Sequence, residues 1–229
     1  MDQAAFARTC SGLGIELTGA QLSAFEGFEC ALYEANRTRN LTRVPQAECW
    51  LRHFVDSLLI AEFLPHGASA LDIGSGPGFP AWPLACGRPD LAVTALDSSG
   101  KMLDFLGTQP LPNLAILQGR AEENPPREAF DTVTGRALAP LAIQIELSAA
   151  PCKVGGMVIP MRTPGDEPFP PPAPGLGLRL EGTERRELPG TEIVRVFPIY
   201  RKVKSTAPKF PRTWAEIRRA ATSPTSSSP

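Results

Sequence analysis

A glycine-rich segment is the part of the sequence in which residue type and spacing indicate chemistry most directly. Residues 71–78 read LDIGSGPG and end a short apolar run. Glycines allow a tight backbone turn and the close approach of a ligand where a Cβ atom would collide. A dinucleotide fingerprint would need G-x-G-x-x-G, but Phe79 follows Gly78, and no G-K-[ST] phosphate loop is present. The segment therefore predicts a ligand-binding turn of another kind.

Polar residues follow the next two apolar runs. Asp97 ends the run 91–97, and Glu122 comes shortly after the run 114–119. The carboxyl ends of parallel strands converge at one edge of a sheet, where an acid such as Asp97 can accept hydrogen bonds from ribose hydroxyls. Glu122 and its backbone neighbours are placed to contact an adenine. One glycine turn could be purely structural, but three elements at successive strand ends favour a nucleoside pocket.

The elements that must position these residues alternate along the chain. Apolar runs at 70–74, 91–97, 114–119, 130–138 and 155–161 are separated by helix-length segments, which predicts βαβ units and a parallel sheet. The runs 176–184 and 191–203 have no such segment between them and predict an antiparallel strand pair. The predicted fold is α/β, with a mostly parallel seven-stranded sheet and an antiparallel C-terminal pair.

The flanking regions have different patterns. Helical spacing of apolar residues over 18–36, with Thr18 as N-cap, and a second pattern over 46–64 predict an N-terminal helical cap of residues 1–65. The main domain then spans 66–212. Within it, six prolines at 163–175 predict a surface loop. Residues 213–229 are expected to form a partly disordered tail, because 222–229 are of low complexity.

Composition narrows the classes of protein. Hydrophobic residues make up 42% and charged residues 21%, and no apolar run approaches the length of a membrane span. Without a basic leader and apolar core at the N-terminus, we expect a cytoplasmic protein. Five scattered cysteines and two histidines predict neither a disulfide framework nor a metal site.

The net charge of −1 conceals an asymmetry. Residues 195–219 hold eight Lys/Arg and one acid, a local charge of +7 that leaves −8 on the remainder. Such a segment suits contacts with nucleic-acid phosphates, although a solvated strand and tail would have the same composition.

Taken together, the motifs resemble those of a known family, the bacterial small-subunit rRNA guanine-N7 methyltransferases (RsmG/GidB). The glycine segment alone resembles the first motif of Rossmann-like class I methyltransferases. The wider resemblance covers residues 20–212 and is carried by N-L-T at 40–42, R-H-x-x-D-S at 52–57, D-I-G-S-G-P-G-F-P at 72–80, L-D-S at 96–98 before Lys101, R-A-E-E at 120–123 and G-R-A at 135–137.

The resemblance implies methyl transfer from S-adenosylmethionine to N7 of a guanine in 16S rRNA. It implies that the cofactor is bound by Asp72, Gly74, Gly76, Gly78, Phe79, Asp97, Ser98, Ala121, Glu122 and Arg136. Arg136 and His53 would border the base pocket as the candidate catalytic residues. Guanine N7 already has an in-plane lone pair, so alignment of the reactants can suffice and no general base is required. Whether His53 acts as a base is left open.

The resemblance also suggests the RNA contacts. We expect phosphate or base contacts from Asn40, Arg52, Arg201, Lys202, Lys204 and Arg212, assisted by Arg37 and Arg39. The target guanine should be unstacked, because side chains read RNA sequence mainly in single-stranded regions. Two departures weaken the C-terminal assignments: Met161-Arg162 stands where the family often has Lys-Gly, and Thr-Trp-Ala-Glu follows Arg212. The expected partner is small-subunit rRNA or a ribosomal particle, bound by a monomer away from membranes.

Two other functions remain open at this point. A class I methyltransferase of a protein or small molecule would keep its activity after nuclease treatment of the substrate. A catalytically silent RNA-binding assembly factor would not bind S-adenosylmethionine.

Overall fold

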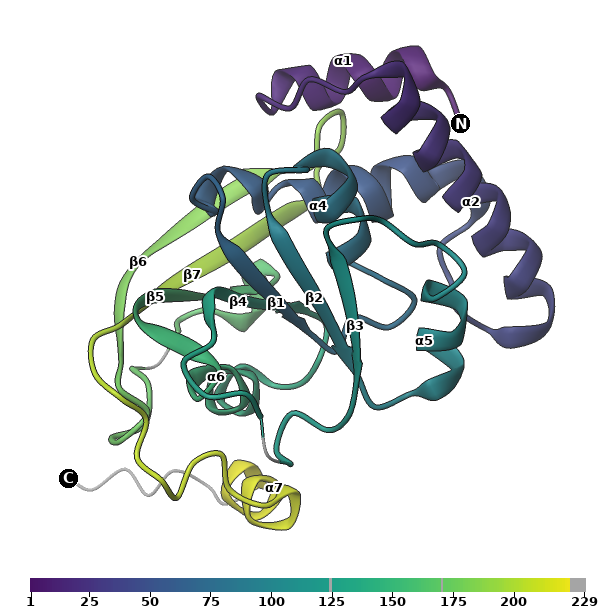
Figure 1. Cartoon of the computed structure of the whole chain (residues 1–229). Coiled ribbons are helices and arrows are strands. Elements are labelled where there is room, and N and C mark those ends of the chain that lie inside the picture. Colours follow the sequence, from purple (N-terminus) through teal and green to yellow (C-terminus); the bar gives the residue numbers. More distant parts are fainter. Residues whose placement is uncertain (124, 170, 223–229) are drawn as a thin grey trace.

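The computed structural model describes residues 1–123, 125–169 and 171–222, which form a seven-stranded sheet with helices on both faces (Figure 1). The strand order is β3-β2-β1-β4-β5-β7-β6. The strands are β1 (Ser69–Ile73), β2 (Ala92–Asp97), β3 (Leu114–Gln118), β4 (Phe130–Arg136), β5 (Cys152–Met161), β6 (Leu178–Glu187) and β7 (Val194–Lys202). Strands β1 to β5 are parallel, and β7 is antiparallel to both β5 and β6. The predicted fold class is confirmed.

The register of the strands brings their carboxyl ends level. Ile73 pairs with Leu96, Asp97 with Gln118, and Arg136 with Met161. Ile73, Asp97, Gln118, Arg136 and Met161 are the last residues of their strands, so the parallel strands end at the same side of the sheet. The end of each parallel strand therefore delivers its next few residues to one side of the molecule, where α/β proteins bind their ligands.

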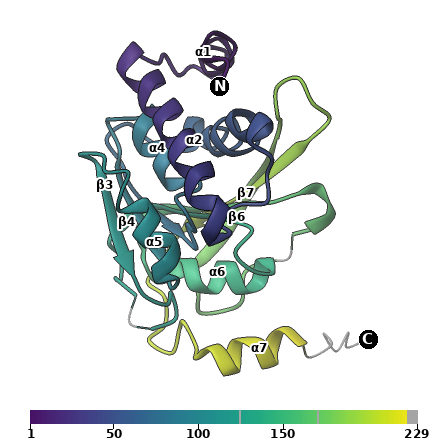
Figure 2. The ribbon, with the colours of Figure 1, turned by 90° about the vertical axis from the view of Figure 1, so that its right-hand side faces the viewer.

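The helices divide between the two faces of the sheet (Figures 1 and 2). Helices α4 (Ala81–Gly87) and α5 (Gly100–Leu106) share one core with the N-terminal helices, and α6 (Leu141–Ala149) and α7 (Trp214–Thr222) share the other. Because successive side chains of a strand point to opposite faces, Ala70 belongs to the first core and Leu71 to the second.

The N-terminal region contains α1 (Gln3–Gly12) and α2 (Gly19–Arg39). Thr18 caps the start of α2, as its sequence predicts, and the structure adds a reciprocal capping box with Gln21; α1 was not predicted. The Gln21 side chain also donates to the carbonyl oxygen of Cys86 at 2.7 Å. Phe25 packs edge-on against Trp82 of α4, with ring centroids 5.2 Å apart. The region is thus joined to the sheet through α4.

The prediction of one helix over 46–64 was wrong in detail. The segment is divided into a 3-10 turn η1 (Gln46–Glu48), a π-helical stretch η2 (Trp50–Val55), a short α3 (Asp56–Leu58) and a second 3-10 turn η3 (Ala61–Phe63). Apolar periodicity over so short a segment does not distinguish these windings, whose hydrogen bonds span three, four or five residues. Wide π turns often occur at functional sites, and this one carries Arg52 and His53.

The C-terminal region is more ordered than expected. Residues 214–222, placed by the sequence in a tail, form α7 against α6. The Pro-rich loop includes a 3-10 turn, η4 (Pro164–Asp166). Most of the stretch predicted to be disordered, residues 223–229, lies outside the described residues. Within the described part of the chain, every helix is too short or too polar to cross a membrane.

Candidate active site

A cavity of about 200 Å³ lies at the carboxyl ends of β1, β2 and β3, and we call it the strand-end cavity. It collects residues from the three elements that the sequence singled out, together with residues from the segment after β4, from α6 and from α7. Its lining comprises Ile73, Gly74, Leu96, Asp97, Ser98, Gly119, Arg120, Ala121, Glu122, Leu138, Ala139, Leu147 and Trp214.

Asp97 fastens the glycine turn to the end of β2. Its Oδ2 atom accepts a hydrogen bond from the Gly76 amide at 2.8 Å, and its Oδ1 atom accepts one from the Ser99 amide at 2.8 Å. Gly74 lies beneath this turn with φ +74°, and a Cβ atom added there would be 2.5 Å from Leu138 Cδ1. The carboxylate therefore faces the turn, and the positive φ of Gly74 favours glycine at this position.

Asp72 supports the turn from below and does not line the cavity. It is buried, and its Oδ2 atom accepts a hydrogen bond from the Ala81 amide at 2.9 Å. Its Oδ1 atom has no hydrogen-bond partner among the described residues. Burial, assisted by the charge of Asp97, raises the pKa of Asp72 to about 7. Gly76, Gly78, Phe79 and Arg136, which were also predicted to bind the cofactor, are likewise absent from the lining of this cavity.

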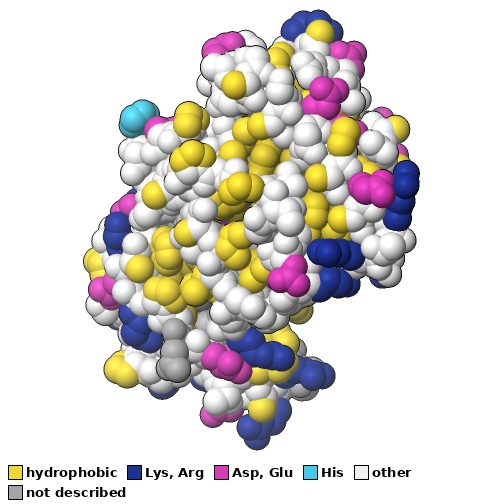
Figure 3. All heavy atoms as spheres, turned by 45° about the vertical axis from the view of Figure 1, so that its right-hand side comes forward, with side chains coloured by type: hydrophobic (Ala, Val, Ile, Leu, Met, Phe, Trp, Pro, Cys, Tyr) yellow, Lys and Arg dark blue, Asp and Glu magenta, His cyan; other side chains and the backbone are white. Residues whose placement is uncertain are grey.

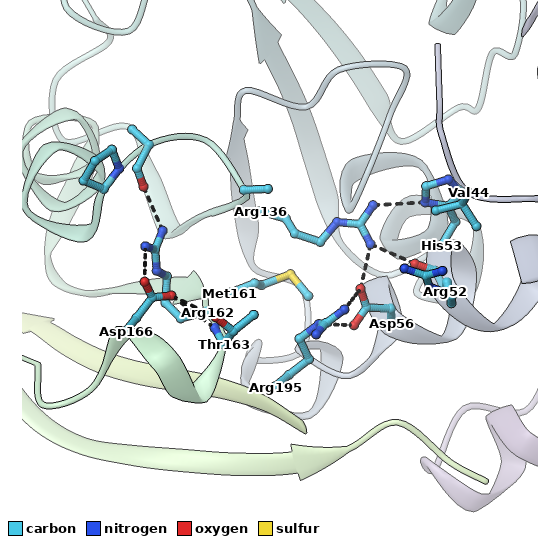
Figure 4. Close-up of a pocket in the computed structure, with 13 residues that line it drawn as sticks. Val44, Arg52, His53, Asp56, Arg136, Met161, Arg162, Thr163, Asp166 and Arg195 are labelled. Atoms are coloured by element: carbon cyan, nitrogen blue, oxygen red, sulfur yellow. Dashed lines mark hydrogen bonds and ion pairs between the residues drawn. The ribbon is translucent and has the colours of Figure 1, made fainter. Parts of the chain in front are cut away.

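A second cavity, of about 690 Å³, adjoins the first, and we call it the arginine-lined cavity (Figure 4). Ala139 lines both cavities, at the end of the segment that follows β4. Within this segment Ala137 has φ +53°, a backbone conformation that is strained for a residue with a Cβ atom. The cavity is lined by Val44, Arg52, His53, Asp56, Arg136, Ala137, Ala139, Pro140, Met161, Arg162, Thr163, Asp166 and Arg195.

Asp56 organises the charges of the arginine-lined cavity. It is 1% exposed and lies between two guanidinium groups (Figure 4). Arg136 Nη1 is 2.8 Å from its Oδ2 atom, whereas Arg195 donates from Nε to Oδ1 at 2.7 Å and from Nη2 to Oδ2 at 3.2 Å. One buried carboxylate thus fixes two arginines that come from the ends of different strands.

His53 is held as a neutral ring. Its Nδ1 atom is 3.2 Å from Arg136 Nη2, and its Nε2 atom is 2.7 Å from the Thr42 hydroxyl. A guanidinium can only donate, so we assign Nδ1 as an acceptor and place the proton on Nε2. The ring stacks on Phe79, with centroids 4.1 Å apart and planes at 3°. Burial and the nearby charges of Arg136 and Arg52 lower the pKa of His53 to about 3.

The predicted RNA contacts separate into different places. Lys202 was wrongly assigned: it is 0% exposed, and its ammonium donates to Leu176 O, Ala149 O and the Thr206 hydroxyl, so no phosphate can reach it. Arg201 lines another cavity beside the amino ends of β1 and β5, and Lys204 follows it at the exposed end of β7. Arg212 is ion-paired with Glu146.

On the N-terminal side, the predicted contacts are exposed. Arg52 lines the arginine-lined cavity and pairs with Glu48 at 2.7 Å. Asn40 caps the end of α2 with φ +49° and is exposed, as is Arg39. Arg37 is paired with Glu34, and both of these side chains are exposed.

Sequence reasoning did not assign roles to several residues that line the two cavities. Asp56 belongs to the R-H-x-x-D-S motif, so a signal for it was available. Arg195 and Arg162 were noted only as part of a basic run and as a departure from the family, and Trp214 only as part of another departure. Their contributions depend on how distant segments fold together, which spacing does not reveal.

The strand-end cavity has the chemistry of an adenosine pocket. Asp97 supplies a carboxylate beside the glycine turn, and the side chains of Leu96, Leu138 and Leu147 supply apolar walls. Gly119 to Glu122 add backbone groups at the far side. Among the described residues, no group of three or more His, Cys, Asp or Glu is arranged to hold a metal ion.

The sheet order, the glycine turn and the acid at the end of β2 define a Rossmann-like class I methyltransferase fold. Solved structures share it. TYW2 from M. jannaschii, in complex with AdoMet, aligns with a TM-score of 0.52 at 16% identity over 64% of this chain and 74% of that one. A TehB-like SAM-dependent methyltransferase from Corynebacterium glutamicum aligns with a TM-score of 0.52 at 19% identity, over 75% and 97%.

The sequence comparisons identify the family. The model of the GidB family, rRNA small subunit methyltransferase G, matches residues 21–167. Ribosomal RNA small subunit methyltransferase G from Lactobacillus delbrueckii subsp. bulgaricus is 36% identical over 93% of this chain and 96% of the relative, and that from Lachnoclostridium phytofermentans is 36% identical over 92% and 93%. The chain belongs to the rRNA small subunit methyltransferase G family.

Proposed function

We propose that the protein transfers a methyl group from S-adenosylmethionine to N7 of a guanine in 16S rRNA. The observation that carries this proposal is the pair of adjoining cavities, one with the walls of an adenosine pocket and the other lined by arginines. Membership of the rRNA small subunit methyltransferase G family supports both the reaction and the substrate.

The strand-end cavity would hold the nucleoside part of the cofactor. Asp97 is placed to accept hydrogen bonds from the ribose, and Ala121 and Glu122 to contact the adenine. When bound, S-adenosylmethionine supplies a methyl group on a positively charged sulfur. Asp72 and Phe79 contribute indirectly, because they support the turn and the ring of His53.

The arginine-lined cavity would hold the guanine. Arginine donors pair well with guanine O6, and Arg136 is fixed by Asp56 in the lining of this cavity. N7 needs no deprotonation before it attacks. The neutral ring of His53, with its Nδ1 atom engaged by Arg136, therefore acts in positioning and not as a proton acceptor. Catalysis then depends on alignment of the reacting atoms and exclusion of water.

The RNA strand would be held mainly on the side of α2 and η2. Arg52, Asn40, Arg37 and Arg39 are exposed near the arginine-lined cavity or on α2, and we propose that they contact phosphates and sugars. Arg201 and Lys204 lie beside the amino ends of the strands, so we propose them only as contacts to a more distant stretch of RNA. We also propose that the protein is cytoplasmic, which agrees with its five free cysteines. We propose further that it acts as a monomer.

Transfer of a labelled methyl group tests the function directly. The purified protein would be incubated with isotopically labelled S-adenosylmethionine and either small ribosomal subunits lacking the modification or their extracted RNA. Mass spectrometry of the digested nucleosides should show labelled 7-methylguanosine. Label that survives nuclease treatment in the protein fraction would indicate a different substrate, and binding of RNA without binding of the cofactor would indicate a silent assembly factor. Steep weakening of RNA binding with salt is expected from phosphate contacts.

A further inference from the structure

The C-terminal helix contributes an aromatic side chain to the strand-end cavity. Trp214, the first residue of α7, lines this cavity opposite elements that come from the ends of β2 and β3. Figures 1 and 2 show α7 (yellow) lying below α6, at the same end of the molecule as the loops that follow β3. A residue from the last helix of the described chain thus completes a pocket formed mainly by its first three strands.

Helix α7 is anchored firmly enough to hold that side chain in place. The backbone amide of Arg212 donates to Glu146 Oε1 at 2.9 Å, and its guanidinium pairs with the same carboxylate, which is buried on α6. Thr213 caps the helix together with Glu216, whose Oε2 atom accepts from the Thr213 amide at 3.0 Å. Ile217 is 2% exposed in the core beneath the sheet. These contacts fix both the start and the inner face of α7.

Trp214 itself is left uncovered. It remains 38% exposed, although Ile217, three residues further along the same helix, is buried. The other large apolar side chains that are exposed in the described chain, Ile116, Leu117, Val154 and Val203, do not line this cavity. Figure 3 shows Lys, Arg, Asp and Glu side chains together with hydrophobic ones at the lower end of the molecule, where α7 lies. An indole at the rim of a cavity with leucine walls offers a flat apolar surface for a flat ring.

We propose that Trp214 stacks on the adenine ring of S-adenosylmethionine and closes the outer side of its pocket. Leu96 and Leu147 supply apolar surroundings in the lining of this cavity, and Asp97, in the same lining, would accept hydrogen bonds from the ribose. The inference depends on the proposed function, because that places the nucleoside in the strand-end cavity. It makes α7 part of the cofactor site, in a stretch where this sequence departs from its family.

Calorimetry with S-adenosylhomocysteine, which cannot transfer a methyl group, tests the stacking in the full-length protein. Trp214→Ala should weaken binding about tenfold, the range of aromatic–base stacking, whereas Trp214→Phe should stay within about threefold of the wild type. Adenosine alone should be weakened by a similar factor in Trp214→Ala. Val154→Ala is the control, since Val154 is also exposed but lies at the amino end of β5. Wild-type affinity in Trp214→Ala would overturn the inference.

Tryptophan fluorescence separates direct contact from displacement of α7. Trp82 is buried and neither it nor Trp50 lines the cavity. Addition of S-adenosylhomocysteine should change the emission of the wild type and not that of Trp214→Phe. An equal change in both proteins would refute stacking even if Trp214→Ala binds weakly. If the wild type binds neither S-adenosylmethionine nor S-adenosylhomocysteine, the proposed function fails as well. If the wild type binds them and Trp214→Ala binds equally well, only the stacking inference fails.

Discussion

The two adjoining cavities are built in opposite ways. The strand-end cavity is formed largely by short stretches at the carboxyl ends of β1, β2 and β3, and its lining combines backbone turns, the acidic residues Asp97 and Glu122, and apolar walls. The arginine-lined cavity gathers side chains from five separated segments around a single buried carboxylate, Asp56. The residues of the strand-end cavity are therefore recognisable from local sequence motifs. The arginine-lined cavity depends instead on ion pairs between residues that are far apart in the sequence.

The comparison predicts that the largest single effect belongs to the arginine-lined cavity. Arg136→Ala removes the pair with Asp56 at 2.8 Å and the contact with His53, and leaves a buried carboxylate held by Arg195 alone. Misplacement of the base should reduce methyl transfer to rRNA about hundredfold, while affinity for S-adenosylmethionine falls far less. Steady-state kinetics together with calorimetry would measure the two quantities.

A matched arginine controls for the general cost of losing an ion pair. Arg186 pairs with Glu62 on the exposed side of β6, away from both cavities. Arg186→Ala should leave methyl transfer within about twofold of the wild type, because exposed pairs contribute little. If Arg136→Ala were no slower than Arg186→Ala, the arginine-lined cavity would lose its place in the reaction.

Substitutions in the strand-end cavity should weaken binding of the cofactor and should not affect the positioning of the guanine. Asp97→Asn keeps the size of the side chain but replaces one acceptor oxygen by a donor, next to the Gly76 and Ser99 amides at 2.8 Å. We expect affinity for S-adenosylmethionine to fall about tenfold, since hydrogen bonds to charged groups contribute roughly 1.5–3 kcal/mol. Ser98→Ala, a neighbour in the same lining, should lower affinity much less. Equal effects of the two variants would contradict a special role for Asp97.

The same contrast explains what the sequence could predict. Asp97, Ser98, Ala121 and Glu122, which line the strand-end cavity, could be predicted because each lies at or shortly after the end of a recognisable strand, and parallel strands end at one side of the sheet. Lys202 was misassigned because a basic run does not reveal which side chain turns inward. Arg195 lies 139 positions from its partner Asp56, and neither periodicity nor spacing connects such residues. Helix α7 was missed because its buried apolar residue, Ile217, packs into a core formed by segments that are distant in the sequence.

The pKa of His53 allows the charge balance of the arginine-lined cavity to be tested. The folded-state pKa is about 3, below the ordinary value of 6.5. His53 therefore supports the fold fully above pH 6.5, and this contribution is lost as the pH falls, because only the unfolded chain takes up the proton. Relative to His53→Gln, the wild type should lose about 2 kcal/mol of unfolding free energy between pH 7.5 and pH 5. Denaturant titration measures it, and a constant difference would mean that His53 is not held neutral.

The smallest effect is expected at Asp72, beneath the strand-end cavity. Its pKa is raised to about 7, so the folded protein retains a proton that the unfolded chain has already released, and stability declines as the pH rises toward 7. From pH 6 to pH 8 the wild type should lose about 1 kcal/mol of unfolding free energy relative to Asp72→Asn.

Asp131 provides the control. Burial acts to raise the pKa of Asp131, but hydrogen bonds from Lys153 and Ser69 outweigh it and lower the pKa to about 2. Asp131→Asn should therefore differ from the wild type by the same amount at both pH values. A pH-dependent difference at Asp131 but not at Asp72 would show that the turn of the strand-end cavity is not supported by a protonated carboxyl group.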